Sequence, residues 1–322
     1  MKKRLGILIG FLTFFLLGVL SIPSIDWYKE RLFPQEIKRE RLRKILGIDE
    51  IPNWPEVTFL GKERVDGIEK RLIGFISPDG IPIKAYILVP EGGQKFPLVI
   101  AINGHGSTKE EVVGMVDMGN NADYGLILAK RGFVVLAPDV RFSNKASREE
   151  DMYSLNAILY GKSLNGVRLL DILTFLEYAI NLPEIDKSKI GCVGWSLGGA
   201  LAMYLSACDR RIKAVYISGY YCSFARSIMR MRCTTDNYIP GILRFGDMDE
   251  IASLIIPRHI LIESGEKDTL FPIDSVNDMV QRLEEKYQKA KVYGRIKHNI
   301  FPGNHIFSGK GMAEWLNESL KK

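Results

Sequence analysis

Short apolar runs alternate with amphipathic stretches along most of this chain of 322 residues. Residues 97–102 form a continuous apolar run, as expected of a strand buried on both faces, whereas 167–180 repeats apolar residues at helical spacing. Period and turn residues together predict strands at 57–60, 69–77, 81–89, 97–102, 133–137, 190–194, 211–218, 259–264 and 292–300. They predict helices at 33–48, 123–130, 167–180, 197–207, 275–289 and 311–320, with an irregular polar segment at 140–163.

This alternation of strands and helices indicates the fold class. Strands joined by helical crossovers run parallel, and the helices cover both faces of the sheet. We therefore predict an α/β fold with a mainly parallel central sheet in one domain, residues 56–322. Residues 219–257 interrupt the alternation with aromatic and methionine residues, so we expect a small cap-like insertion there.

The N-terminal arm carries a separate signal. Residues 5–22 hold no charge and follow a basic start, and as a helix they would be about 27 Å long, enough to cross a hydrocarbon core. We expect residues 1–26 to be a retained signal anchor, with a cleaved signal peptide and a buried helix as alternatives. Residues 27–55 then form a stem or linker helix, which Pro52 and Pro55 end.

Basic residues flank this apolar run on both sides. Those before it favour an extracytoplasmic body, and those after it favour the opposite orientation. We expect a membrane-anchored protein whose main domain is extracytoplasmic, or a secreted protein.

The charge distribution restricts the partners. The net charge is +6, and residues 1–50 alone carry 10 basic and 6 acidic side chains. The remaining domain is therefore nearly neutral and offers no basic field for nucleic acid. Metal-ligand spacings and glycine-rich nucleotide loops are also missing from the sequence, so we expect neither a metal nor a cofactor. Whether Cys222 pairs with Cys233 stays open.

A serine lies at a sharp turn between the strand at 190–194 and the helix at 197–207. The sequence there is Gly194-Trp195-Ser196-Leu197-Gly198. Small residues on both sides allow a strained turn that exposes the hydroxyl at a helix N-terminus. The pattern predicts that Ser196 is a nucleophile.

A serine hydroxyl needs a base, and the base needs an orienting acid. His305 follows the last predicted strand and Asp268 follows the strand at 259–264, so both lie at the sheet edge expected for Ser196. His298 and His105 are alternative bases, but the first lies within a strand and the second precedes the serine.

Two other carboxylates compete with Asp268 as the acid. Glu263 falls inside a strand, and we expect Asp274 to cap the following helix. The chain order serine, acid, histidine is that of hydrolases with a strand–turn–helix nucleophile. An oxyanion would need backbone N–H donors, which we assign to Leu197 and, in the turn 103–106, to His105.

Several stretches together resemble one known superfamily. They are NGHGS (103–107), GWSLGG (194–199), DRRIKAVYISGYY (209–221), NYIPGILRFGDMDEIASLIIPR (237–258), ESGEKDTLFP (263–272) and GNH (303–305). The chain resembles the α/β-hydrolases, and within them the serine esterase branch that is dienelactone-hydrolase-like and acetyl-xylan-esterase-like. The resemblance implies that Ser196 is the nucleophile, Asp268 the acid and His305 the base.

Two departures from that branch stand out. Asn103 replaces the histidine with which the oxyanion turn often begins, and Ser196 stands where true dienelactone hydrolases have cysteine. The resemblance implies a serine hydrolase that cleaves small-molecule carboxylic esters through an acyl-enzyme. A peptidase or acyltransferase of the same fold, or a non-catalytic binding protein, is the alternative.

Overall fold

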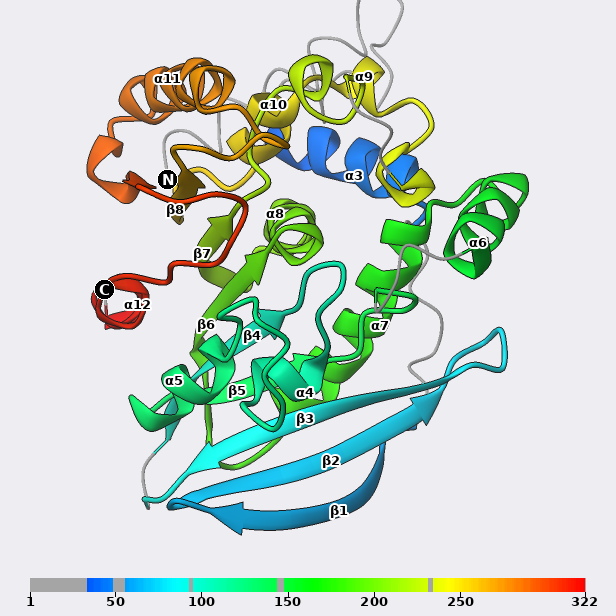
Figure 1. Cartoon of the computed structure of the whole chain (residues 1–322), viewed down its shortest axis with the longest axis vertical. Helices are drawn as coiled ribbons and strands as arrows, with labels where there is room; N and C mark the ends of the chain where they lie inside the picture. The colour runs from blue at the N-terminus through cyan, green and yellow to red at the C-terminus, as the bar shows by residue number, and fades with distance from the viewer. Residues whose placement is uncertain (1–33, 49–55, 93–94, 144–147, 231–233, 322) are drawn as a thin grey trace, which may run out of the picture. The chain divides into compact units, whose positions relative to one another are not determined.

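The computed structural model describes residues 34–48, 56–92, 95–143, 148–230 and 234–321 (Figure 1). The predicted anchor (1–26), both ends of the predicted stem (27–33 and 49–55) and Cys233 lie outside these residues. Residues 39–322 form one compact unit, and no helix among the described residues has the length and apolar character to cross a membrane. The helix expected at 33–48 is α3 (Pro34–Leu46), whose Leu42 and Leu46 are fully buried.

Within the described residues, nine strands form a single sheet in the order β1-β2-β3-β5-β4-β6-β7-β8-β9. Their bounds are Thr58–Val65, Ile68–Ile76, Pro82–Pro90, Phe96–Ile102, Val134–Pro138, Ile185–Trp195, Ile212–Ser218, His259–Gly265 and Ile296–Phe301, for β1 to β9. The contacts β1–β2, β2–β3 and β3–β5 are antiparallel, and every pair from β5–β4 to β8–β9 is parallel. The prediction of a mainly parallel sheet is confirmed.

Helices cover both faces of this sheet, as expected. They are α4 (Lys109–Val112), α5 (Tyr124–Lys130), α6 (Arg148–Leu159), α7 (Leu164–Ala179), α8 (Leu197–Cys208), α9 (Ile242–Phe245), α10 (Met248–Ser253), α11 (Ile273–Lys289) and α12 (Met312–Lys321). Figure 1 shows α5 and α12 on one side of the sheet and α7 and α8 on the other. Buried residues of α11 belong to the same core as those of α8. Alternate residues of β4 enter the two cores, with Leu98 and Ile100 in one and Val99 and Ala101 in the other.

The segment 140–163 differs from the prediction. It contains the helix α6, in which Glu150, Ser154 and Ala157 face inward while Met152 and Leu159 are exposed. Polar or small residues therefore occupy the buried side of this helix. A search for an apolar face misses such a helix because its hydrophobic pattern is inverted.

Residues 219–257 contribute directly to the core. They contain short 3₁₀ turns (Phe224–Arg226 and Thr235–Asn237) as well as α9 and α10. Tyr221 and Met248 are buried in the core that α8 and α11 share. The function of this segment as a cap over the site stays a prediction.

Candidate active site

The turn between β6 and α8 holds Ser196 in a strained backbone conformation. Its φ is 54° and its ψ is −121°, in a region that few residues other than glycine adopt. A Cβ on Gly194 would lie 2.0 Å from the carbonyl oxygen of Gly198, and a Cβ on Gly198 would lie 1.9 Å from that of Ile102. Only glycine fits these two positions, so the backbone can turn sharply enough to present Ser196 at the start of α8.

Two other predicted residues meet this serine. His305 Nε2 lies 2.9 Å from Ser196 Oγ, and His305 Nδ1 lies 2.7 Å from Asp268 Oδ2. Their loops follow β9 and β8, and parallel strands bring these loops to the same edge of the sheet as the β6–α8 turn. The structure thus places the three side chains in one hydrogen-bonded series.

Backbone groups hold the carboxylate of this series. Asp268 is 5% exposed, and its Oδ1 accepts hydrogen bonds from the N–H groups of Leu270 and Phe271. Oδ2 is thereby directed to His305. This fixed carboxylate can set the tautomer of the imidazole and stabilise its cation.

Aromatic rings flank the histidine. The Phe271 ring stacks on that of His305 at 5.6 Å between centroids, and the Trp195 ring lies 5.5 Å away. Trp195 had no predicted function, and the structure places its buried ring against the imidazole. These two rings restrict the orientation of His305.

The competing candidates lie in other surroundings. His298 Nε2 lies 3.2 Å from the hydroxyl oxygen of Ser264, and burial lowers the pKa of His298 to about 4. Glu263 is buried, and its carboxylate accepts hydrogen bonds from Tyr216 and Ser218. Asp274 lies in the first turn of α11, whose N-cap is Pro272, so the expectation that Asp274 caps this helix is wrong.

The turn 103–107 packs directly on the serine. A Cβ on Gly104 would lie 2.8 Å from the carbonyl oxygen of Trp195, so the two backbones are in contact. The side-chain nitrogen Nδ2 of Asn103 donates to Ser107 O and to Ser143 Oγ, both at 2.9 Å. Asn103, which departs from the usual histidine, therefore supports the turn with its own side chain.

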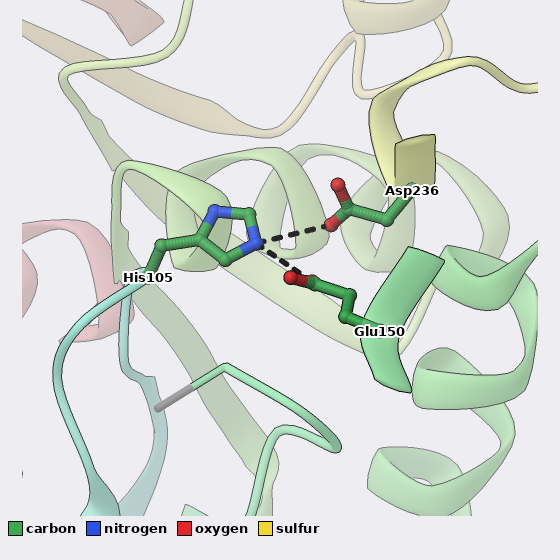
Figure 2. Close-up of side chains that lie close together, drawn as sticks. All are labelled: His105, Glu150 and Asp236. Carbon is green, nitrogen blue, oxygen red and sulfur yellow. Dashed lines mark hydrogen bonds and ion pairs between the residues drawn. The ribbon is translucent and has the colours of Figure 1, made fainter. Parts of the chain in front are cut away.

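His105 has a side-chain environment that the sequence did not indicate. Its Nε2 lies 2.9 Å from Glu150 Oε1 on α6 and 3.3 Å from Asp236 Oδ2 (Figure 2). Arg168 on α7 pairs with both carboxylates, and the side chains of all three partners are fully buried. We call these four residues, His105, Glu150, Arg168 and Asp236, the His105 network.

Opposing effects act on the His105 imidazole. Burial lowers its pKa, but the hydrogen bonds and charges of Asp236 and Glu150 outweigh burial and raise the pKa to about 9. The same contacts hold the pKa of Asp236 well below its usual range, against the effect of burial. At neutral pH the His105 imidazole is therefore protonated and the Asp236 carboxylate is ionised.

Three residues of the His105 network are of types that bind metal ions. His105, Glu150 and Asp236 each offer a ligand atom, and these atoms lie within 4.8 Å of one another. However, both carboxylates already accept hydrogen bonds from Arg168. A metal cation would have to displace a guanidinium from a charge-balanced cluster, so the donor set fits an ion-pair network better than a metal site.

Comparison with known proteins identifies relatives. The model of the "Dienelactone hydrolase family" matches residues 83–313. The protein YtaP of Bacillus subtilis is 26% identical over 266 residues, covering 78% of this chain and 87% of YtaP. The 2,6-dihydropseudooxynicotine hydrolase of Paenarthrobacter nicotinovorans is 33% identical over 255 residues, covering 75% of this chain and 63% of that protein.

Solved structures share the fold. The acetyl xylan esterase of Paenibacillus sp. R4 superposes with a TM-score of 0.62 at 17% identity, covering 89% of this chain and 95% of that one. At this level of identity the similarity concerns the fold alone. It confirms the predicted α/β-hydrolase architecture.

Proposed function

Because this chain belongs to the dienelactone hydrolase family and is thus a carboxylic ester hydrolase, we propose that it acts through a Ser196–His305–Asp268 triad and an acyl-enzyme. A lactone is a cyclic ester, so the family's chemistry agrees with the geometry around Ser196. The observation that carries the proposal is the hydrogen-bonded series from Ser196 Oγ through His305 to Asp268.

In the first half-reaction, His305 Nε2 takes the proton of Ser196 as its oxygen attacks the ester carbonyl. Asp268 stabilises the imidazolium that forms. His305 then returns the proton to the alcohol as it leaves, and the acyl group stays on Ser196.

In the second half-reaction, water replaces the alcohol. His305 takes a proton from the water molecule, the hydroxide attacks the acyl carbonyl, and Ser196 leaves with the proton that His305 returns. The backbone N–H groups of Leu197 and His105 are the proposed donors to the oxyanion in both steps. Loss of one such donor typically costs about 3–4 kcal/mol of transition-state stabilisation.

Covalent labelling tests this proposal directly. A fluorophosphonate probe should label the purified protein at Ser196, and the protein should hydrolyse p-nitrophenyl acetate. The Ser196→Ala variant should lose both the labelling and the hydrolysis while its circular dichroism spectrum stays that of the wild type. A folded wild-type protein that is neither labelled nor active would contradict the proposal.

We also propose that the uncharged run 5–22 attaches the protein to a membrane, with the catalytic domain on the extracytoplasmic side. The support is the sequence alone, since this run is apolar on all faces and follows basic residues. The full chain should sediment with membranes and resist extraction by sodium carbonate. A variant lacking residues 2–26 should be found in the soluble fraction, and equal sedimentation of both forms would contradict the anchor.

A further inference from the structure

The His105 network joins parts of the chain that are far apart in sequence. His105 lies in the turn after β4, Glu150 on α6 and Asp236 in the 3₁₀ turn Thr235–Asn237 (Figure 2). Arg168 lies on α7. Three of the four side chains have no exposed surface, whereas that of His105 is 23% exposed. Burying four ionised groups is costly, and such a cluster is a weak way to stabilise a fold.

The network adjoins the turn that supplies a proposed oxyanion donor. Gly104, the residue before His105, packs on the backbone of Trp195 next to the nucleophile. Gly106, the residue after it, donates its N–H to Ser143 O at 2.7 Å. Arg168 also donates to the carbonyl oxygen of Arg141, so the network and the loop that holds Gly106 are fixed together.

The geometry of the contact favours the cationic form of His105. Nε2 of His105 faces carboxylate oxygens of both Glu150 and Asp236, so it carries a proton in the neutral and the cationic imidazole alike. The two negative charges beside the ring then favour the cation. Glu150 and Asp236 are the charged groups in ion-pair contact with His105 among the described residues, and Arg168 pairs with both. A neutral His105 would leave two buried carboxylates with one guanidinium.

We propose that the side chain of His105, held as a cation between Glu150 and Asp236, is a positioning residue that fixes the turn 103–107 for the oxyanion contact. This inference rests on the proposed esterase function. It assigns to the His105 side chain a function distinct from that of its backbone N–H. It also makes the site depend on a proton outside the triad.

The inference predicts a pH dependence with a definite sign. The pKa of His105 is raised above its ordinary value of 6.5 to about 9, so the cation is complete at neutral pH and is lost as the pH rises through about 9. The turn should then loosen and kcat should fall.

The experiment measures kcat and KM for p-nitrophenyl acetate between pH 7 and pH 10.5, in the wild type and in His105→Gln. At pH 7.5 we expect kcat of the variant to be about 10- to 100-fold lower, with KM little changed, because a misplaced donor acts on the transition state. The fall of kcat above pH 9 should be present in the wild type and absent from the variant. His298→Gln is the matched histidine control, and it should keep the alkaline fall of the wild type.

A second variant separates a loss of stability from a loss of positioning. His105→Gln leaves one excess negative charge in the cluster, and the double variant His105→Gln/Glu150→Gln restores neutrality. It should recover the melting temperature but keep the low kcat and the flat alkaline profile. A purely structural function would restore kcat together with the melting temperature.

Failure of the inference is distinguishable from failure of the proposed function. A wild-type protein without labelling or hydrolysis contradicts the esterase itself, and with it the inference. An active wild type contradicts the inference alone if His105→Gln, or the double variant, keeps a wild-type kcat and the same fall above pH 9.

Discussion

At the scale of single residues, the site depends on two glycines at which no Cβ atom fits. Ser196 adopts a positive φ, and its neighbours Gly194 and Gly198 lie against carbonyl oxygens at distances that no Cβ tolerates. The turn that presents Ser196 therefore depends on two residues that lack side chains. The strain at Ser196 persists because the surrounding packing leaves no alternative.

This packing predicts the effect of one methyl group. Gly198→Ala, although alanine favours helices by about 1 kcal/mol, should destabilise the protein by at least about 2 kcal/mol. The reason is the contact of 1.9 Å that its Cβ would make with Ile102 O. Fluorophosphonate labelling of Ser196 should fall as well. Urea denaturation followed by fluorescence measures the stability change.

The matched control is a glycine with free space around it. A Cβ on Gly294 would meet no atom within 4 Å, and its φ is not in the left-handed region. Gly294→Ala should leave stability and labelling close to those of the wild type. Equal losses of stability and labelling in the two variants would show that the close approach at Gly198 does not prevent a side chain there.

At the scale of elements, a buried ion pair joins α6 and α7. Arg168 of α7 is 1% exposed, and it donates to Glu150 on α6, to Asp236 and to Arg141 O. A single guanidinium thus joins two helices and two loops. Five fixed N–H donors make arginine suited to this contact.

Removing the Arg168 guanidinium should lower the free energy of unfolding. Arg168→Met leaves two buried carboxylates with His105 as their only cation in the network, and we expect a loss of about 3–5 kcal/mol in the free energy of unfolding. Arg131→Met is the control, because Arg131 pairs with Glu314 on the surface, where both side chains are 58% exposed. That exposed pair should contribute little to the free energy of unfolding, because water and salt screen it. Similar midpoints of urea unfolding in the two variants would refute this account of the helix contact.

At the scale of the whole molecule, the sequence predicted most elements and the candidate triad. The strands and most helices follow from apolar periodicity, and the order of Ser196, Asp268 and His305 along parallel strands predicted their meeting at one edge. The prediction failed at α6, whose buried face carries Glu150 and Ser154. A search for apolar periodicity misses a helix whose buried side carries a carboxylate paired with an arginine. The apolar residues of such a helix face solvent.

The His105 network could not be foreseen for a related reason. Its members are separated by up to 131 positions, and none lies in a recognisable motif with another. Pairing of buried charges depends on which loops the fold brings together, and no local spacing encodes this. The sequence pointed to His105 alone among the four, as a backbone oxyanion donor and as an alternative base, and neither function involves the carboxylates that it contacts.

The fold class, the strand–turn–helix serine and the order of the proposed triad could be predicted from the sequence, because periodicity and glycine placement act locally. The fold establishes which histidine meets Ser196, how Trp195 and Phe271 contact its ring, and that His105 lies between two carboxylates. Those outcomes depend on distances between segments remote in the chain. Hydrogen bonds and ion pairs act over a few ångströms, so they exist only once the sheet has brought the segments together.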